Sequence, residues 1–279
     1  MLLDDATEDV KTDISTQREI GIQITAQNEV PDTGPTNKGV WYKIDDVTAV
    51  FADMKRSTQL NVSTSTKFSA RSYTYFIRSM VRIGDRFGAK YMDIQGDGLF
   101  ALFSGKDSVF HAFACAETMR TLTQTEAAKQ LKKDSPHEDW TLAASIGLDR
   151  NTVLVRRLGL RSEKENEVWA GKPVSMAAGL AALGNDNELI VSDRVYSVFE
   201  DASKLRRRAI LWSCGCAGGE AGPGLDADEG QTRELWVRED APPDAAFDFD
   251  SIHRLEAAWC RTHGAEFCQT IVDGKRPSD

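Results

Sequence analysis

The fold of this chain is decided by residues 90–103, which read KYMDIQGDGLFALF. Two short apolar runs, residues 90–95 and 99–103, lie on either side of the tight turn Gly96-Asp97-Gly98. Two such runs separated by a glycine-rich turn are typical of a β-hairpin. We therefore predict two antiparallel strands with Asp97 at the turn between them.

A further strand and a long helix are predicted just before this hairpin. Residues 47–52 read VTAVFA, which is β-branched, apolar and short enough for a buried strand. Phe76, Met80, Ile83 and Phe87 recur at helical spacing and indicate one face of a long helix. After the hairpin we predict a helix over 109–119, strands over 143–147 and 152–155, a helix over 174–183 and a strand over 188–191.

The predicted order β-α-β-β-α-β is that of a ferredoxin-like α+β palm. Residues 209–212 and 234–237 predict an extra C-terminal β-hairpin, and a short amphipathic helix is predicted from Phe247 toward Trp259. Residues 1–40 are polar, acidic and aperiodic, which is typical of a flexible arm. We therefore divide the chain into an arm (1–40), a central domain (41–240) and a C-terminal helix and tail (241–279).

Composition limits the classes of partner. The chain has 279 residues, 41% of them hydrophobic, and a formal net charge of −9 at pH 7. An acidic surface disfavours nucleic acid, and the chain has no apolar run long enough to span a membrane. The first residues do not resemble a secretory signal, so we expect a cytoplasmic protein. The five cysteines are either reduced thiols or part of a zinc site, whose ligands would be Cys214, Cys216, Cys260, His263 and Cys268.

Two aspartates at strand ends carry the predicted chemistry. In a split βαβ palm the first strand lies beside the hairpin, so Asp53 and Asp97 are expected to converge at one edge of the sheet. Two carboxylates on rigid strands are the oxygen ligands that Mg²⁺ and Mn²⁺ prefer. A phosphate substrate would complete the coordination that two carboxylates leave open. The alternative is that each aspartate only caps a turn or a helix.

The residues that follow the first aspartate are Met54-Lys55-Arg56-Ser57-Thr58. They lead from a strand into a helix, whose free backbone N–H groups can face an anion. Lys55 and Arg56 add positive charge, and Ser57 or Thr58 is expected to cap the helix. We therefore predict that this segment binds the phosphates of the substrate.

Five ordered motifs resemble those of the class III nucleotidyl cyclases, the family of adenylate and guanylate cyclase catalytic domains. The motifs are VFADMKRST (50–58), IQGDGLFA (94–101), IGL (146–148) with the later Leu158-Gly159, WAGKPVSMAA (169–178) and ELIVSDRVY (188–196). The resemblance implies that the 3′-hydroxyl of a nucleoside triphosphate attacks its own α-phosphorus, giving a 3′,5′-cyclic monophosphate and pyrophosphate.

The same resemblance implies a cofactor and an assembly. Two Mg²⁺ or Mn²⁺ ions would be bridged by Asp53 and Asp97, with the backbone carbonyl of Met54 as a further ligand. Family members work as head-to-tail dimers, so we expect a homodimer with its sites at the interface.

Asp93 stands where adenylate cyclases carry a lysine that reads the base. An ionised carboxylate only accepts hydrogen bonds, so Asp93 suits the N3–H of uracil or the N1–H of guanine and disfavours adenine. The second base-reading position falls near Trp169. The alternative is that Asp93 is an ordinary surface residue of its strand.

The transition-state residues of the family are replaced in this chain. The family asparagine aligns with Ser175 and the family arginine with Gly179. We take Lys172 and Ser175 as transition-state candidates, and Arg150 or Arg156 as alternative sources of positive charge. The double replacement also leaves open a catalytically inactive, cyclase-like regulatory module.

Within the family, residues 93–98, 169–174 and the late Trp259-Cys260 with His263-Gly264 most resemble the pyrimidine cyclases of the bacterial Pycsar anti-phage system. That resemblance implies synthesis of cyclic UMP or cyclic CMP, read by a separate cyclic-nucleotide-sensing effector, and makes the cysteines look like packing residues. Asp93 favours UTP over CTP because the N3 atom of cytosine is an acceptor. We therefore expect a uridylate cyclase, with a guanylate or cytidylate cyclase as alternatives.

Overall fold

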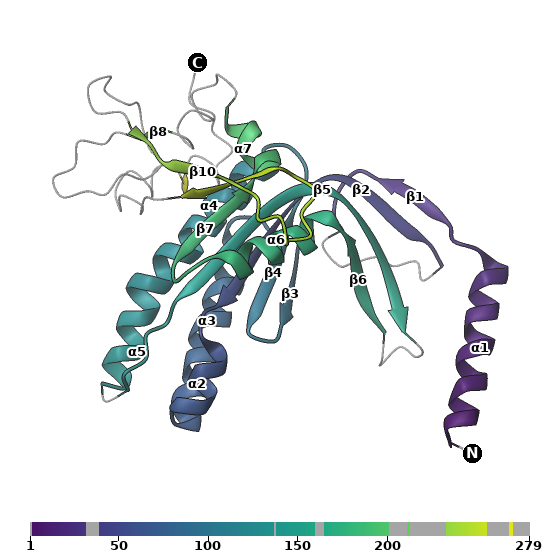
Figure 1. Ribbon diagram of the computed structural model, residues 1–279, viewed down its shortest axis with the longest axis horizontal. Helices are drawn as coiled ribbons and strands as arrows, with labels where there is room; N and C mark the ends of the chain where they lie inside the picture. Colours follow the sequence, from purple (N-terminus) through teal and green to yellow (C-terminus); the bar gives the residue numbers. More distant parts are fainter. Residues whose placement is uncertain are drawn as a thin grey trace.

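The computed structural model describes residues 2–31, 39–136, 138–159, 165–200, 211–212, 233–255 and 268–269. The helices are α1 (Leu2–Ile20), α2 (Ser57–Ser63), α3 (Thr66–Arg86), α4 (Ser108–Leu122), the π-helical turn η1 (Thr123–Ala127), α5 (Ala128–Asp134), α6 (Lys172–Leu183) and α7 (Asp193–Phe199) (Figure 1). The strands are β1 (Ile24–Gln27), β2 (Trp41–Met54), β3 (Tyr91–Gln95), β4 (Gly98–Phe103), β5 (Ala144–Gly159), β6 (Glu165–Gly171), β7 (Glu188–Ser192), β8 (Leu211–Trp212), β9 (Arg233–Glu234), β10 (Trp236–Asp240) and β11 (Ser251–Leu255).

Of the strands that the structure describes, nine form one mixed sheet. Its main path runs β10-β11-β7-β5-β2-β4-β3, with β1 paired to β2 and β6 paired to β5. The strands β5, β2, β4 and β3 are antiparallel neighbours, and β7 is parallel to β5. Helices α2 and α3 connect β2 to β3, and α4 to α5 connect β4 to β5. The βαββαβ order predicted for the ferredoxin-like palm is therefore confirmed.

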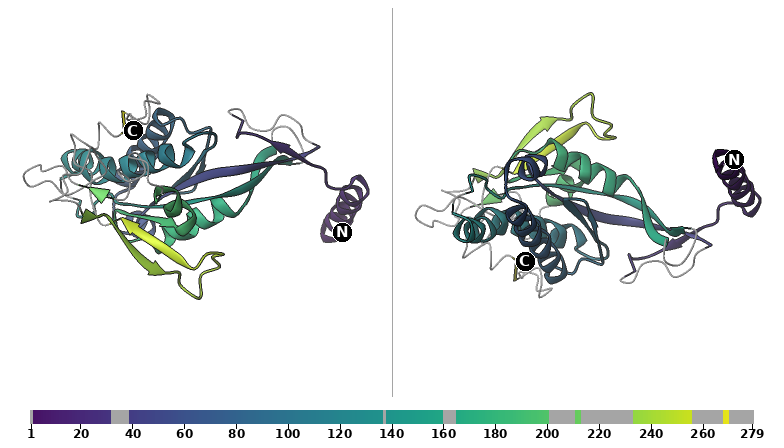
Figure 2. Two further views of the ribbon diagram at one scale, coloured as in Figure 1. Left: turned by 90° about the horizontal axis from the view of Figure 1, so that it is seen from above. Right: turned by 90° about the horizontal axis from the view of Figure 1, so that it is seen from below.

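The sheet separates two layers of helices. Alternate residues of a strand point to opposite faces, and in β2 the residues Val50 and Ala52 lie in the core that α3, α4 and α7 cover. Ala49 and Phe51 lie in the core on the other face, where α6 packs against β2 and β5. Figure 2 shows the blue and teal helices on one side of the sheet and the green α6 on the other.

One continuous strand, β5, replaces the two strands expected over 143–147 and 152–155. The polar residues that suggested a break lie inside the strand, and Asp149 is fully buried there. The hydroxyl of Ser192 and the guanidinium of Arg194 donate hydrogen bonds to the Asp149 carboxylate. Because these partners neutralise and solvate the buried carboxylate, the chain continues as a strand through this point.

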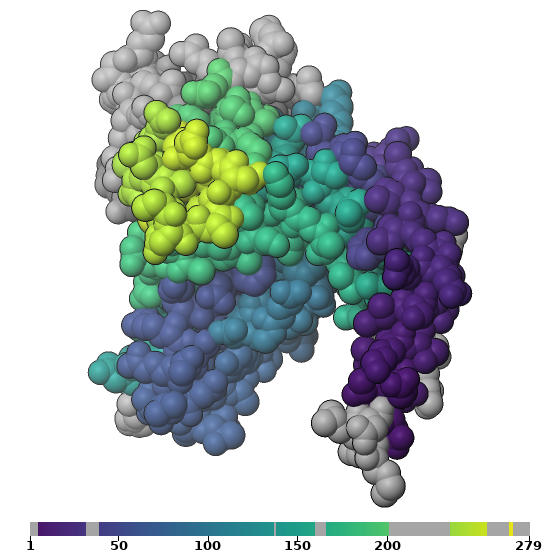
Figure 3. All heavy atoms as spheres, turned by 45° about the vertical axis from the view of Figure 1, so that its right-hand side comes forward, coloured from purple at the N-terminus to yellow at the C-terminus, as the bar shows by residue number. Residues whose placement is uncertain are grey.

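The expectation that residues 1–40 form an aperiodic arm is wrong for residues 2–27. Residues Leu2–Ile20 form the 19-residue helix α1, and β1 pairs in parallel with β2, with Ile24 opposite Trp41. Figures 1 and 3 show α1, in dark purple, projecting from the sheet away from the other helices. Every described side chain of α1 is exposed, so the helix does not bury an apolar face against its own chain.

The helix expected from Phe247 is also wrong over the described residues. Strand β11 stands there instead and pairs antiparallel with both β10 and β7. The short pair β8–β9 occupies the position of the expected C-terminal hairpin. Residues 256–267 and 270–279, which belong to the expected helix and tail, lie outside the described residues. Within the described ranges, every helix is too short or too polar to cross a lipid bilayer.

Candidate functional site

Asp53 and Asp97 lie close together at one end of the β2–β4 pair. Asp53 is opposite Gly98 in the strand register, and Asp97 occupies the turn residue directly before Gly98. Burial raises the pKa of the Asp53 carboxyl, the negative charge of Asp97 raises it further, and Lys55 opposes both effects. The structure thus brings together the two carboxylates that the sequence places at strand ends.

Two glycines allow this close approach. Gly96 has a φ of +64°, a left-handed conformation that glycine adopts without steric cost. A Cβ atom at Gly98 would lie 3.0 Å from the carbonyl oxygen of Ala52 and 3.0 Å from the ring of Phe51. A side chain at position 98 would therefore push the hairpin away from β2 and from Asp53.

The segment expected to bind phosphates is held by the sheet at its start. Met54 is buried at the end of β2, opposite Ala144. The backbone N–H of Lys55 donates to the carbonyl oxygen of Ala143 at 3.0 Å. This pairing fixes the backbone at the point where Lys55 lies near the carboxylate of Asp53.

The turn into α2 differs in detail from the expectation. Arg56, with a φ of +61°, occupies the N-cap position, and its side chain makes no cap hydrogen bond. The expected cap by Ser57 or Thr58 is therefore wrong, because both residues already lie inside the helix. The Arg56 guanidinium pairs with the Asp186 carboxylate at 2.7 Å and donates to the carbonyl oxygen of Thr141. Phosphate binding by Arg56 would require this ion pair to open.

The two candidate base-binding residues lie on the face of the sheet that α6 covers. In the strand register Asp93 is opposite Phe100, which belongs to the core beneath α6. Trp169, on β6, packs against the same core, and Asp53 follows Phe51 on this face by strand alternation. Asp93 and Trp169 are both partly buried. The structure thus gathers the metal and base candidates on one face of the sheet.

Tyr91 links these two candidates, and the sequence reasoning missed it. Its ring contacts Trp169, with the ring centroids 4.5 Å apart at an angle of 41°. Burial raises the pKa of the Tyr91 phenol, and the charges of Asp93 and Glu167 raise it further. The signal for Tyr91 is its position two residues before Asp93, since such residues share a face of a strand.

The candidates Lys172 and Ser175 are both exposed on α6. The ammonium of Lys172 pairs with the Asp248 carboxylate at 2.5 Å. A Cβ atom at Gly179, where the family arginine aligns, would lie 2.8 Å from the ring of Phe247. The space that an arginine would need at position 179 is therefore filled by the loop between β10 and β11.

That loop, residues 241–250, ties α6 to α7. Asp248 pairs with Lys172 from α6 and with Arg194 from α7, the latter at 2.8 Å. Arg194 also pairs with the buried Asp149 at 2.8 Å and lies over the Phe249 ring, 5.0 Å from its centroid. Burial opposes ionisation of Asp248, but the hydrogen bonds from Lys172 and Arg194 outweigh it and hold the pKa of that carboxyl below its usual value.

The alternative cations are engaged elsewhere. Arg150 pairs with Asp46 at 3.0 Å, and Arg156 also has a partner within the chain. Lys172 is likewise paired, with Asp248, so what distinguishes it from these two arginines is its place on α6, which packs against β2.

The donor set fits a hard divalent cation that is completed by substrate. Among the described residues, no cluster of three or more His, Cys, Asp and Glu side chains is arranged to hold a metal alone. Asp53 and Asp97 supply two carboxylates whose mutual repulsion a cation would relieve, and the Met54 carbonyl can add an oxygen. The remaining positions of an octahedral shell would fall to phosphate oxygens and water.

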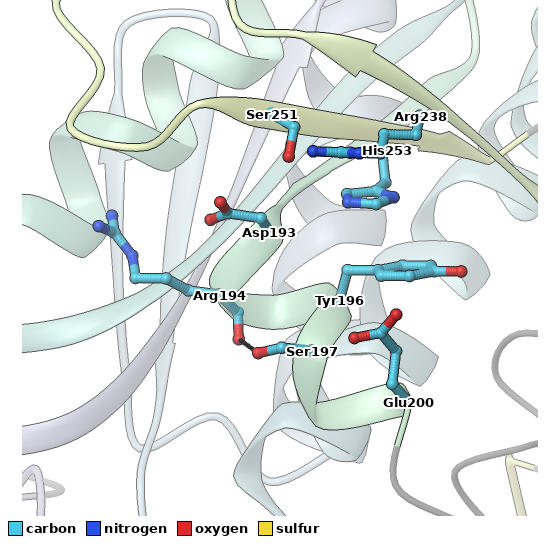
Figure 4. Close-up of a pocket in the computed structure, with 8 residues that line it drawn as sticks. All are labelled: Asp193, Arg194, Tyr196, Ser197, Glu200, Arg238, Ser251 and His253. Carbon is cyan, nitrogen blue, oxygen red and sulfur yellow. Dashed lines mark hydrogen bonds between the residues drawn. The ribbon is translucent and has the colours of Figure 1, made fainter.

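A separate hollow of about 590 Å³ lies between α7 and the β10–β11 pair (Figure 4). Inside it Tyr196 stacks on His253, with centroids 3.8 Å apart, while Arg194 points away from these rings. None of the sequence-predicted site residues is among its described lining residues. Of the zinc candidates, only Cys268 falls within the described residues, where it is a free thiol.

Comparison with known proteins agrees with this geometry. Residues 40–211 match the family described as the adenylate and guanylate cyclase catalytic domain. A uridylate cyclase from Propioniciclava tarda is 31% identical over 89% of this chain and 75% of that protein. A uridylate cyclase from Micromonospora echinofusca is 31% identical over 99% of this chain and 84% of that protein.

A solved structure shares the fold at low sequence identity. The guanylyl cyclase Cya2 superimposes with a TM-score of 0.58 and 14% identity, over 77% of this chain and 93% of that chain. The family match covers more than half of the residues and includes both carboxylates, the hairpin and α6. The chain therefore belongs to the family of adenylate and guanylate cyclase catalytic domains and is a nucleotidyl cyclase of class III.

Proposed function

We propose that the chain converts UTP to 3′,5′-cyclic UMP and pyrophosphate, with two Mg²⁺ or Mn²⁺ ions held by Asp53, Asp97 and the Met54 carbonyl. The observation that carries the proposal is the close pair of carboxylates formed by Asp53 at the end of β2 and Asp97 in the β3–β4 turn. The relatives named uridylate cyclase support the choice of UTP.

In the proposed reaction, the metal ions and the protein side chains would supply different parts of the chemistry. Bound divalent cations would lower the pKa of the attacking 3′-hydroxyl and offset the charge of the leaving pyrophosphate. Asp53 and Asp97 would place those charges, because one comes from the end of β2 and the other from the tight turn between β3 and β4. Lys55 and the free N–H groups at the start of α2 would hold the phosphates. Lys172 would add positive charge where the family uses other residues, and Ser175 would donate a hydrogen bond.

Selection of uracil would follow from Asp93 and its neighbours. The carboxylate of Asp93 accepts the N3–H of uracil, whereas the bare N3 of cytosine and N1 of adenine would face it as acceptors. Tyr91 and Trp169 form the aromatic surface beside this carboxylate, on which a base can stack. Guanine also presents an N–H to a carboxylate, so a guanylate cyclase is the second candidate.

The proposed assembly and context follow from the family resemblance. We propose a head-to-tail homodimer in which Asp53 and Asp97 of one protomer face Asp93, Trp169 and α6 of the other. The cyclic nucleotide would be read by a separate effector in the cytoplasm during anti-phage defence.

A four-nucleotide assay tests the proposal. The purified full chain is incubated separately with UTP, CTP, GTP and ATP in the presence of Mn²⁺, and products are identified by mass spectrometry. We expect cyclic UMP as the main product, and none from the isosteric variant Asp97→Asn. Dominant cyclic GMP or cyclic CMP would overturn the choice of UTP, and no product from any nucleotide would favour the inactive regulatory module.

A further inference from the structure

The N-terminal helix α1 presents a surface that the rest of its own chain leaves uncovered. Every side chain from Asp5 to Ile20 is exposed, including Val10 at 58% and Ile14 at 62%. Figures 1 and 3 show α1 standing away from the body of the molecule. Most of the stability of protein helices comes from tertiary packing of one face, so we expect another surface to cover α1.

Two stripes run side by side along α1. Ala6, Val10 and Ile14 recur every four residues and form an apolar stripe. The residue before each of them is an aspartate, at positions 5, 9 and 13, so an acidic stripe runs parallel to the apolar one, about 100° away around the helix. Over its whole length α1 carries six acidic and two basic residues. A covering surface should therefore combine apolar contacts with positive charge.

A groove on the outer helices has these properties. It has a volume of about 570 Å³, lies between α3 and the α4–η1–α5 segment, and is lined by Tyr75, Leu122 and Ala127. Arg78 and Arg82 line the same groove and are exposed. Within the described part of the chain, no hydrogen bond or ion pair is made by either guanidinium. Glu126 also lines the groove, which therefore carries two cations and one carboxylate beside its apolar floor.

The spacing of charges on the two surfaces agrees. Arg78 and Arg82 are four residues apart on α3, as Asp9 and Asp13 are on α1. Four helical residues rise about 6 Å, so two helices laid side by side can pair both charges at once. Val10 and Ile14, with the same rise, would then enter the apolar part of the groove.

We propose that α1 of one copy docks into the groove beside α3 of a second copy. The same chain cannot fill its own groove in this structure, because α1 and the outer helices lie at opposite ends of the molecule in Figures 1 and 2. Pairing of two α1 helices is disfavoured, since it would bring like acidic stripes together. Mutual exchange of α1 between two copies would close a dimer with twofold symmetry. This contact is independent of the proposed reaction.

Cysteine cross-linking in mixed full-length chains tests the contact. One chain carries Ile14→Cys and a second, of different tagged mass, carries Thr74→Cys at an exposed position that lines the groove. We expect a cross-link between the two masses, above the level of the unsubstituted parent and of a Lys67→Cys partner, which is exposed on α3 outside the groove. No specific cross-link, or an equally strong Ile14→Cys link between two copies of the first chain, would overturn the proposal.

Charge reversal identifies the ion pairs. The double change Arg78→Asp with Arg82→Asp in the groove chain should lower cross-link yield about tenfold. Combining it with Asp9→Arg and Asp13→Arg in the α1 chain should restore the yield, whereas Arg86→Asp, on α3 but outside the groove, should leave it unchanged. Failure of the restoration would overturn the charge pairing. Cyclic nucleotide synthesis is measured separately, so loss of this contact leaves the proposed function standing.

Discussion

At the residue scale, we propose that Asp93 selects the base that the site accepts. Asp93→Asn replaces a charged acceptor by an amide that both donates and accepts. We expect the ratio of kcat/KM for UTP to that for CTP to fall about tenfold or more, because the bond to uracil loses its charge and the amide can donate to cytosine N3. Steady-state kinetics with both nucleotides measure the ratio. An unchanged ratio, equal to that of a control with Ile94→Ala at an exposed position of the same strand, would indicate that Asp93 is an ordinary surface residue.

Gly179 shows why the family arginine cannot simply be restored. Its Cβ position lies 2.8 Å from the Phe247 ring, so Gly179→Arg would overpack the contact between α6 and the 241–250 loop. We expect a loss of about 1–3 kcal/mol in the free energy of unfolding and no gain in activity.

Chemical denaturation of matched variants checks this expectation. Gly179→Ala should cost less than Gly179→Arg, and adding Phe247→Ala to Gly179→Arg should recover part of the loss. Higher activity of Gly179→Arg at full stability would show that an arginine can reach the site after all.

At the element scale, the 241–250 loop joins α6 to α7 through Asp248. The pKa of this carboxyl is below its usual value, since hydrogen bonds from Lys172 and Arg194 outweigh burial. A carboxyl with a lowered folded pKa stabilises the fold above its unfolded pKa and loses that contribution as pH falls through the folded value.

We therefore expect Asp248→Asn to lower the free energy of unfolding by about 1 kcal/mol at pH 7. The difference from wild type should shrink as pH falls below about 4, where the wild-type carboxyl takes up its proton. Urea denaturation across this pH range measures both values. The exposed Asp250→Asn is the matched control, and equal pH profiles of the two variants would contradict a stabilising role for Asp248.

The helices and strands also show which parts of the fold the sequence could and could not predict. The β3–β4 hairpin, β2 and α3 follow from local patterns, because α3 buries apolar residues at helical spacing and β2 and β4 contain short apolar runs buried on both faces. The continuity of β5 does not, since buried Asp149 depends on Ser192 and Arg194, distant in sequence. Helix α1 buries no described side chain, so its apolar residues Ala6, Val10 and Ile14 do not mark a face that packs on the core of the same chain.

Some features of the candidate site could likewise be predicted from the sequence, and others could not. The convergence of Asp53 and Asp97 was predictable, because strand ends and a hairpin turn fix both backbones. The contact of Tyr91 with Trp169 and the pairing of Lys172 with Asp248 join segments that only the folded chain brings together. Local sequence carries no signal for such contacts.

At the scale of the whole molecule, the proposed homodimer divides each site between two protomers. A chain with Asp97→Asn lacks the metal side, and a chain with Asp93→Lys lacks the base side. In mixed dimers one site would carry both changes and the other neither, so equal amounts should regain about a quarter of the wild-type rate. Activity assays after co-refolding or co-expression measure the gain. Activity that stays at the level of the separate variants would place both groups in one protomer.

The most direct test measures Mn²⁺ binding in the presence of 3′-deoxy-UTP, which keeps the triphosphate but lacks the attacking hydroxyl. Electron paramagnetic resonance of free Mn²⁺ gives the number of bound ions for wild type, Asp53→Asn, Asp97→Asn and the control Asp93→Asn. We predict two ions per site in wild type and in Asp93→Asn at saturating nucleotide, and an affinity at least about 100-fold weaker in the other two variants. Equal Mn²⁺ binding by wild type and both carboxylate variants would contradict the assignment of Asp53 and Asp97 as the metal-binding pair.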